Sequence, residues 1–299
     1  MKRAVSISIG SSKRDKAVEI DLLGEKVSIE RIGTDGSMEK AAQIYRELDG
    51  KVDAFGVGGT DLGLTVGRRY YPLYSIQPMV RFIKQTPFVD GGGLRTCLES
   101  QIGQFLEDNL GSYIKEKKAM VTVGVDRWDV ATSFVAAGYD CVFGDLMFAL
   151  GVPIPLHKLS QLKTLAALML PIFGRLPFEL VYPTGEKQEV RTPKFEKYYQ
   201  WATVIAGDCH YVKGHMPDRL EGKVIATNTT TPEDVALFRQ VGIKYLVTST
   251  PVLDGRSFGT NMMEAAMIAV AGKGRKLTGD ELREMLGQLG FQPQLQELN

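Results

Sequence analysis

A histidine and an aspartate stand two positions apart after a short apolar segment in the last third of the sequence. The imidazole of His210 has an unperturbed pKa of about 6.5, so it can exchange a proton near neutral pH. Asp208 could orient that imidazole if both residues lie in a turn. The pair is therefore a candidate for general acid–base catalysis. The alternative is a histidine that only makes a hydrogen bond within its loop.

Other polar groups follow the next two apolar segments. Asn228 and Thr229 come directly after residues 224–227, and Thr248 ends the segment 245–248. The carboxyl ends of parallel strands share one edge of a sheet, and ligands bind at that edge. We therefore assign Asn228, Thr229 and Thr248 to the binding of cofactor or substrate hydroxyl groups. Turn or capping chemistry would explain each loop taken alone.

The loop GVDRWD, which begins at Gly124, stands where a dinucleotide-binding domain has its glycine-rich loop. Only the first glycine is present, and Asp126 and Asp129 stand near the other two glycine positions. Their carboxylates would repel a pyrophosphate, which Arg127 could offset. Asp145, 21 residues after Gly124, suits a ribose contact and favours NAD over NADP. We predict an NAD or NADP site here, against a loop that binds something else or nothing.

Two glycine clusters in the first third of the chain, 56–59 and 91–93, each lie beside an aspartate. The second cluster opens a predicted helix and resembles a backbone nest for anions. A third loop, 254–261, precedes an apolar helix and carries an arginine that could bind a carboxylate in a bidentate manner. Tight turns would also explain these glycines. The residues that we assign to the substrate are Asp61, Asp90, Gly92, Arg256 and Asn261.

Short apolar segments alternate with helical ones along most of the chain, which is typical of an α/β protein. Segments such as 119–124 and 204–206 predict parallel strands with helices covering both faces of a sheet. We predict a doubly wound, Rossmann-like parallel sheet over residues 113–299, with an apolar insertion near 146–182. A smaller N-terminal α/β domain on the substrate side is predicted over residues 1–112. The ligand would then lie in the cleft between the two domains.

Composition excludes several classes of protein. The 299 residues carry 36 Lys and Arg against 35 Asp and Glu, without the basic excess of a dedicated nucleic-acid-binding protein. A hydrophobic fraction of 44% excludes a disordered chain. The three cysteines are far apart and lack zinc spacing, so no metal site is expected. Glycine is abundant, at 32 residues, and gathers in the loops described above.

The start of the sequence shows no signal peptide, and the most apolar run covers only residues 165–173. That run is about half of the ~20 residues that a membrane helix needs. We therefore expect a cytoplasmic protein that makes no membrane contact. The apolar segment 146–182 could form the surface of a homodimer.

Six stretches of the sequence form a recognisable set. They are ISIGSSKR (7–14), ERIGTDG (30–36), GDL (144–146), YPTGEKQ (182–188), NTTT (228–231) and GRSFGTN (255–261). With these stretches the chain resembles bacterial proteins labelled quinate (or shikimate) 5-dehydrogenase. The resemblance spans nearly the whole chain and implies a Rossmann-type oxidoreductase. It also implies NAD(P)-linked oxidation of a ring hydroxyl on a polyhydroxy cyclohexane carboxylate.

The leading hypothesis is thus an NAD(P)-dependent oxidoreductase that acts on a hydroxyl of a small polyhydroxy carboxylate. A second hypothesis is a Rossmann-like ligand-binding or regulatory protein without hydride transfer, which the missing glycines of the loop after residue 124 favour. A third is a transferase or lyase that uses the same cleft on a nucleotide or acyl substrate. Binding of NADH or NADPH distinguishes the first hypothesis from the second.

Overall fold

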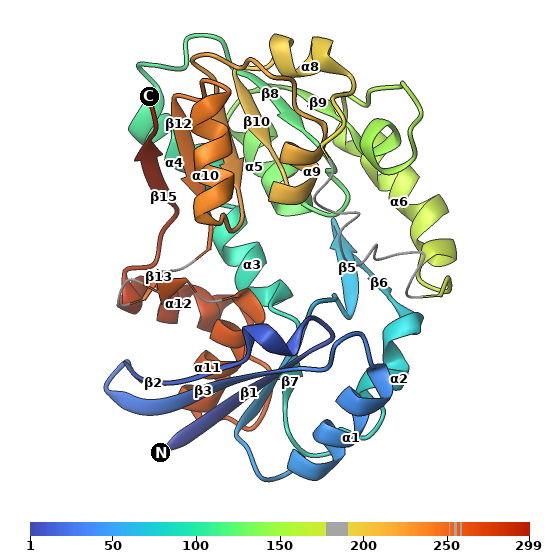
Figure 1. The fold of residues 1–299 in the computed structure, drawn as a ribbon, viewed down its shortest axis with the longest axis vertical. Helices are drawn as coiled ribbons and strands as arrows, with labels where there is room; N and C mark the ends of the chain where they lie inside the picture. Colours follow the sequence, from blue (N-terminus) through green and yellow to red (C-terminus); the bar gives the residue numbers. More distant parts are fainter. Residues whose placement is uncertain (178–190, 251, 254–255, 258) are drawn as a thin grey trace.

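The computed structural model describes residues 1–177, 191–250, 252–253, 256–257 and 259–299. Two α/β units lie along the long axis of the molecule (Figure 1). One combines the N-terminal strands, in blue, with C-terminal helices, in red; the other is built mainly from the middle of the chain and adds the C-terminal strand at residues 294–297. The predicted α/β class with parallel sheets is confirmed.

The first unit contains a five-stranded sheet in the order β2-β3-β1-β4-β7. β1 pairs in parallel with β3 and β4, and β2 forms an antiparallel hairpin with β3. That hairpin turns at Gly24, whose φ of +81° favours glycine. The strands are β1 (Lys2–Ser8), β2 (Lys16–Leu22), β3 (Glu25–Gly33), β4 (Ala54–Gly58) and β7 (Phe88–Val89).

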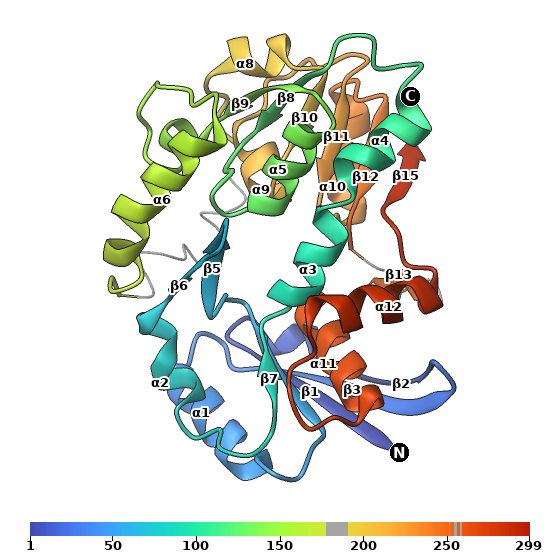
Figure 2. The same cartoon turned by 180° about the vertical axis from the view of Figure 1, so that it is seen from behind.

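Helices cover both faces of this first sheet. α1 (Met38–Leu48) and α2 (Gln77–Val80) pack on one face, and α11 (Thr260–Ala271), backed by α12 (Gly279–Leu289), packs on the other. The hydroxyl of Ser37 accepts the N–H of Lys40, as expected for the cap of α1. A small hairpin, β5 (Gly63–Val66) and β6 (Arg69–Pro72), extends from this unit toward the other one (Figure 2).

The second unit contains a six-stranded sheet in the order β15-β12-β11-β10-β8-β9. The first five strands in sequence are parallel and β15 is antiparallel. Because β8 lies between β9 and β10, the chain reverses direction across the sheet there, and ligands bind at such a switch point in doubly wound sheets. The strands are β8 (Lys118–Val121), β9 (Asp140–Phe143), β10 (Val204–Ala206), β11 (Val224–Thr227), β12 (Tyr245–Thr248) and β15 (Gln294–Glu297).

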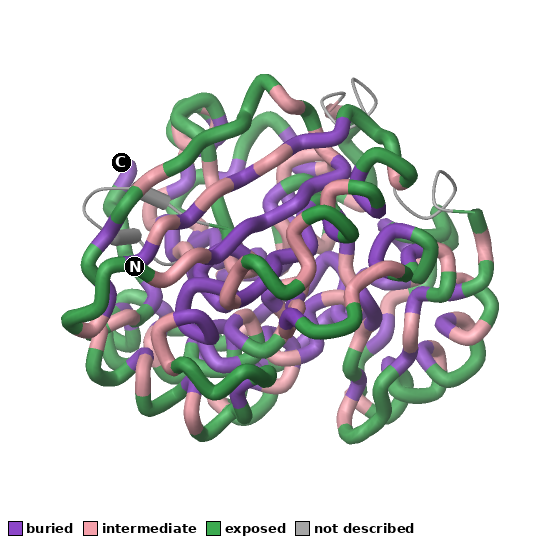
Figure 3. The backbone as a smooth tube through the Cα atoms, turned by 90° about the horizontal axis from the view of Figure 1, so that it is seen from below, coloured by how far each residue is buried: buried purple, intermediate pink, exposed green. Residues whose placement is uncertain are grey.

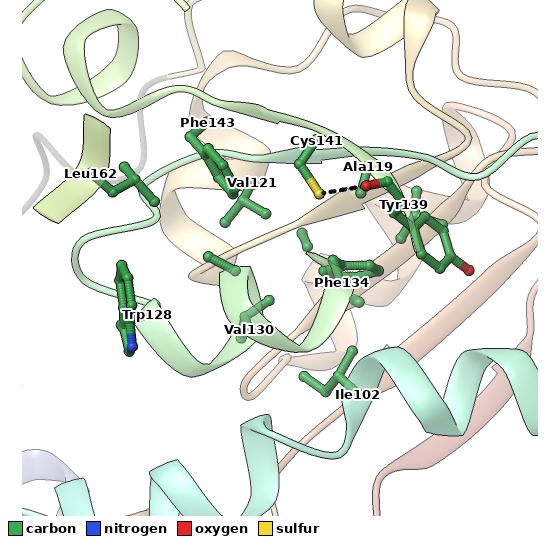
Figure 4. Close-up of a cluster of buried hydrophobic side chains, with 14 of the residues drawn as sticks. Ile102, Ala119, Val121, Trp128, Val130, Phe134, Tyr139, Cys141, Phe143 and Leu162 are labelled. Carbon is green, nitrogen blue, oxygen red and sulfur yellow. Dashed lines mark hydrogen bonds between the residues drawn. The ribbon is translucent and has the colours of Figure 1, made fainter. Parts of the chain in front are cut away.

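Alternate residues of these strands are buried on opposite faces of the sheet, which confirms the doubly wound arrangement. Val121 packs with α4 (Ile102–Leu110), α5 (Trp128–Ala136) and α6 (Leu159–Phe173). Met120 packs on the other face with α8 (Glu196–Trp201), α9 (Cys209–His215) and α10 (Pro232–Gln240). Figure 4 shows the first of these clusters, in which Phe134 of α5 lies beneath the sheet. Burying one such large apolar side chain contributes roughly 1.5–3 kcal/mol.

The chain returns to the first unit after β12. α11 packs against β1, β3 and β4, and its residues Met262 to Ala269 are all buried. Residues 260–289 therefore pack with the first sheet, whereas the sequence assigned all of 113–299 to the second domain. The sequence predicted a buried apolar helix here correctly, but a helix that is apolar on every side does not reveal which sheet it covers.

Figure 3 shows buried residues along the central segments of the molecule and exposed residues around its rim. α6 exposes apolar side chains to solvent, since Leu168 and Ile172 are 65% and 58% exposed. The homodimer surface predicted for this apolar region stays a prediction. Within the described ranges, no helix combines the length and the hydropathy needed to cross a bilayer.

Candidate functional site

A cavity of about 190 Å³ lies between the two units. β5 and β6 form one side, α3 (Gly92–Glu99) and the amino end of α5 form the other, and the segment before α12 closes it. A second hollow of about 490 Å³, between α4 and residues 290–295, has no titratable side chain in its described lining. The charged residues of the smaller cavity are Asp90, Arg95, Glu99, Asp126, Asp129 and Lys276.

The amino end of α3 is held by two carboxylates of the chain itself. Asp90 accepts the N–H of Gly92 at 2.9 Å and that of Leu62 at 2.7 Å. Glu264 of α11 accepts the N–H of Leu94 at 2.9 Å. The nest that the sequence offered to an anion, including the predicted substrate residue Gly92, is therefore occupied by the protein's own acidic groups. Helix N-termini favour such negative charge.

Close backbone contact explains the glycine at the start of this turn. Gly91 has a φ of +87°, and a Cβ atom on it would lie 2.3 Å from the backbone nitrogen of Asn261. Asn261 in turn donates a hydrogen bond to the hydroxyl of Ser6 at 2.6 Å. The glycine cluster therefore lets the amino end of α11 approach the sheet. Asn261, predicted to bind substrate, anchors that helix end.

α3 carries two charged side chains that the sequence analysis missed. Arg95 forms an ion pair of 3.0 Å with Asp61, which the sequence did assign to the site. Glu99, one turn further along the helix, is 3% exposed and lies 3.2 Å from the guanidinium of Arg127. The spacing of four residues puts Arg95 and Glu99 on one face of α3, a signal that its apolar pattern concealed.

Arg127 connects the cavity to the edge of the second sheet. Its guanidinium contacts Glu99, lies 3.2 Å from the carboxylate of Asp126, and forms a short hydrogen bond with Asp208. Asn228, at the end of β11, donates to the same Asp208 oxygen at 2.8 Å. The structure thus brings together four predicted site residues, Asp126, Arg127, Asp208 and Asn228.

The predicted pairing of His210 with Asp208 is wrong in its geometry. Asp208 caps α9, so its carboxylate accepts the backbone N–H of His210 at 2.9 Å and has no hydrogen bond from the imidazole. The side chain of His210 is exposed and does not line the cavity. Burial raises the pKa of Asp208, but Arg127 and the His210 N–H together hold it below its ordinary value.

Asp145, predicted to bind a ribose, instead binds the loop after β8. Its two carboxylate oxygens accept the N–H groups of Gly124 at 2.9 Å and Val125 at 2.7 Å. The side chain is 3% exposed, and burial raises its pKa to about 6 in spite of these bonds. Both amides of Gly124 and Val125 are therefore already occupied.

The acidic groups around the cavity have altered proton affinities. Burial raises the pKa of Glu99 to about 7, although Arg127 and Arg95 favour its charged form. Burial also raises the pKa of Asp126 and of Asp129, which accepts a hydrogen bond of 2.8 Å from the hydroxyl of Thr96. A cluster of perturbed carboxyl groups in a cleft is typical of a functional site.

Of the remaining predicted residues, Thr229 and Thr248 do not line the cavity. The hydroxyl of Thr229 shares a hydrogen bond of 2.5 Å with that of Thr250, and Thr248 is half-buried at the end of β12. The backbone of Arg256 belongs to β14 (Arg256–Ser257), opposite β13 (Val252–Leu253), and its side chain lies outside the described part of the structure.

Metal binding finds no support in the side chains that the structure describes. None of them form a group of three or more His, Cys, Asp or Glu that could hold a metal ion. The carboxylates around the cavity are instead engaged by Arg95, Arg127 and backbone N–H groups.

Comparison with known proteins gives distant structural similarity. The chain covers 95% of its length and 84% of the NAD-dependent malic enzyme from Thermotoga maritima, at 11% identity and a TM-score of 0.37. A bifunctional 5,10-methylenetetrahydrofolate dehydrogenase/cyclohydrolase from Thermoplasma acidophilum gives 11% identity, coverages of 91% and 90%, and a TM-score of 0.30. A candidate malic enzyme (malate oxidoreductase) gives 15% identity over 85% of this chain and a TM-score of 0.36, and the chain spans only 64% of its length. These similarities are too distant to carry an argument about activity.

The sequence matches no curated protein, but it matches two family models. Residues 3–90 match the model described as Domain of unknown function (DUF8753), and residues 93–298 match the model described as Domain of unknown function (DUF8754). The two matches meet at the turn between β7 and α3, on the wall of the cavity. Because the second match covers more than half of its length, the chain belongs to the family Domain of unknown function (DUF8754).

Proposed function

We propose that the cavity between the two units binds a small polyhydroxylated substrate and that Glu99 transfers a proton to or from it. The observation that carries this proposal is Glu99 itself: a buried carboxyl group on the cavity wall whose pKa is about 7. A group with that pKa is present in both protonation states near neutrality, which is the condition for general acid–base catalysis.

The opposing influences on Glu99 suit this role. Burial favours the neutral carboxylic acid, and Arg127 favours the carboxylate. The side chain is also held in position by Arg127, 3.2 Å away, and it lies on a helix whose amino end is held by Asp90 and Glu264. A proton-transfer group on a rigid helix keeps its geometry when substrate binds.

The chemistry of the cavity wall favours a ligand with several hydroxyl groups. Asp90, Asp126 and Asp129 offer carboxylate oxygens that accept hydrogen bonds from such groups. A volume of about 190 Å³ is below the roughly 300–1,000 Å³ of sites for drug-sized ligands, so the ligand is small. Large or strongly anionic ligands fit this wall poorly.

Of the two cations in the described lining, Lys276 is the one available to a substrate carboxylate. Arg95 is paired with Asp61, whereas the ammonium group of Lys276 lies 5.0 Å from the centre of the Phe88 ring. We propose that Lys276 receives the carboxylate of a polyhydroxy acid, the substrate class that the resemblance to quinate dehydrogenases implies. Lysine binds such a group as a point charge.

The same resemblance implies that NAD or NADP oxidises a substrate hydroxyl. The bound cofactor would then supply the hydride acceptor. The residues around the loop after β8 do not fit a dinucleotide, because Asp145 occupies the amides of Gly124 and Val125. We therefore assign to this chain the binding of the hydroxyl group and the removal of its proton by Glu99, and no step to the cofactor.

Calorimetric titration with quinate, shikimate and myo-inositol tests the proposal. We expect saturable binding of quinate or shikimate, which Lys276→Met weakens about tenfold, an effect worth ~1.4 kcal/mol. The same substitution leaves binding of the uncharged myo-inositol unchanged. Lys115→Met, at an exposed lysine outside the cavity lining, is the matched control. Absence of binding by all three compounds overturns the proposed substrate class.

A further inference from the structure

The protein's own side chains occupy the place where a doubly wound sheet binds its ligand. In a sheet of this order the switch point lies outside the carboxyl ends of β8 and β10. A dinucleotide at that point needs free backbone N–H groups at the start of the following helix and an open crevice between the two strand ends. The contacts of these loops meet neither requirement.

Asp145 satisfies the N–H groups. Its two oxygens bind the amides of Gly124 and Val125 separately, at 2.9 and 2.7 Å, as two oxygens of a phosphate would. The side chain is buried, so these bonds are shielded from water. A pyrophosphate would have to displace a carboxylate that the fold has already placed there.

The crevice between the strand ends is filled by an ion pair. Arg127, which follows β8, bonds directly to Asp208, which follows β10, and Asn228 donates to the same carboxylate. Arg127 is 6% exposed and also contacts Glu99 and Asp126. It therefore cannot turn toward a bound phosphate without leaving buried carboxylates unpaired.

The loops also pack tightly on one another. A Cβ atom on Gly124 would lie 2.8 Å from Leu162 and 3.2 Å from Phe143, which stand side by side above α5 in Figure 4. A Cβ atom on Gly207 would lie 2.1 Å from the hydroxyl of Thr122. These glycines therefore serve close contact between the loops, at positions where even a Cβ atom would clash.

We infer that the switch point of the second sheet is a closed, nucleotide-free centre in which Asp145 replaces a phosphate and Arg127 joins the sheet to α3. Four contacts of two side chains carry this inference: the two amides on Asp145, and the pairs of Arg127 with Asp208 and with Glu99. It does not depend on the cavity binding a substrate.

Titration of the protein with NADH and NADPH, combined with hydrogen exchange of residues 122–127, tests the closed loop. We expect no change in the exchange of this segment at ligand concentrations up to about 1 mM, where a weak complex would already form. Binding that leaves the segment unaltered agrees with the inference, since the ligand then sits elsewhere. Saturable binding that protects residues 122–127 from exchange overturns it.

The substitution Asp145→Asn tests the carboxylate directly. Loss of a hydrogen bond to a charged acceptor should speed the amide exchange of Gly124 and Val125 by about tenfold or more. Asp140→Asn, at the exposed aspartate that begins β9, the strand before Asp145, is the matched control and should leave both rates unchanged. Equal exchange in the Asp145→Asn variant and the wild type shows that the carboxylate does not hold the loop and overturns the inference.

Discussion

The carboxylate of Glu99 lies 3.2 Å from the guanidinium of Arg127, and both side chains are buried where α3 meets the second unit. Because Arg127 also binds Asp208, one residue connects the cavity wall to the edge of the sheet. Removing one partner of a buried ion pair is more costly than the pair itself is stabilising, since the other charge stays buried. The residue that we propose for proton transfer is therefore held by a contact that also stabilises the fold.

Replacement of Arg127 with Met should destabilise the fold strongly. The substitution leaves Glu99, Asp126 and Asp208 without their shared cation, and breaking a buried pair costs about 3–5 kcal/mol. Urea unfolding followed by circular dichroism measures this loss. Arg68→Met, at an exposed arginine, is the control and should change stability by about 0.5 kcal/mol at most. A loss as small as that of the control would contradict the role assigned to Arg127.

Replacement of Glu99 with Gln should remove proton transfer while keeping the shape of the side chain. Turnover of a substrate found by the binding titrations should fall about 10²–10⁴-fold, the usual contribution of a general acid or base. The pH–rate profile should also lose its inflection near pH 7, since burial sets the pKa of Glu99 at about 7. Glu47→Gln, on the exposed face of α1, should keep both rate and inflection. An inflection that persists in the Glu99→Gln variant assigns the titrating group elsewhere.

Glu264 should make the protein less stable as pH rises. Burial raises its pKa from the ordinary 4.5 to about 7, so the folded protein keeps a proton that the unfolded chain releases between these values. Stability therefore falls as pH increases through this window, by up to about 3 kcal/mol at 1.36 kcal/mol per pKa unit. Denaturant midpoints at pH 5 and pH 7.5 measure the slope. Glu264→Gln should reduce the slope to the part that Glu99 and Asp145, whose pKa values burial also raises, contribute, and the exposed Glu284→Gln should leave it unchanged; an equal slope in all three proteins refutes this assignment.

Several features of the fold could be predicted from sequence because they depend on local pattern. The apolar segments at 204–206 and 224–227 are buried strands, and the apolar helix beginning near Asn261 is buried on every side. Asp61, Asp90 and Asp126 lie at or beside the cavity, as expected from their places after strands. The carboxyl ends of parallel strands lie at one edge of the sheet, so the order of the elements is enough to place these aspartates near a common site.

The partners of these groups could not be predicted, because they come from elements that are distant in sequence. The sequence around Asp145 does not indicate that its carboxylate binds the loop after β8 instead of a ribose. Similarly, the glycine at position 91 indicated an anion-binding nest, whereas it accommodates the backbone of Asn261, 170 residues further on. The sequence showed which residue types could take part in chemistry. Only the fold showed that other parts of the chain already form hydrogen bonds or close contacts with them.

The pair at Asp208 and His210 gives a direct comparison between sequence and structure. Asp208→Asn should destabilise the protein by about 1–3 kcal/mol, because Arg127 loses a charged partner. His210→Ala should change stability by about 0.5 kcal/mol at most, because its imidazole is exposed and only its backbone N–H binds Asp208. Thermal unfolding measures both. Equal losses would show that the imidazole and the carboxylate act as a unit after all.

Gly91 and Gly36 separate the cost of a left-handed backbone from the cost of close contact. Both have a φ of +87°, so substitution with alanine imposes the same conformational strain, roughly 1–2 kcal/mol. A Cβ atom on Gly36 meets no atom within 4 Å, whereas on Gly91 it would lie 2.3 Å from the backbone nitrogen of Asn261 and 2.5 Å from the hydroxyl of Thr260. Backbone cannot move aside as a flexible side chain can, so Gly91→Ala must displace the amino end of α11 from the sheet.

We therefore expect Gly91→Ala to lower the free energy of unfolding by at least about 2 kcal/mol more than Gly36→Ala, the range of overpacked sites. It should also increase amide exchange at the start of α11 and α3, since Asp90 and Glu264 hold α3 from positions on either side of this contact. Urea unfolding and hydrogen exchange of the two variants measure both effects. If the two glycines tolerate alanine equally, the glycine cluster at 91–93 has no packing role, and an anion-binding role for its backbone would regain support.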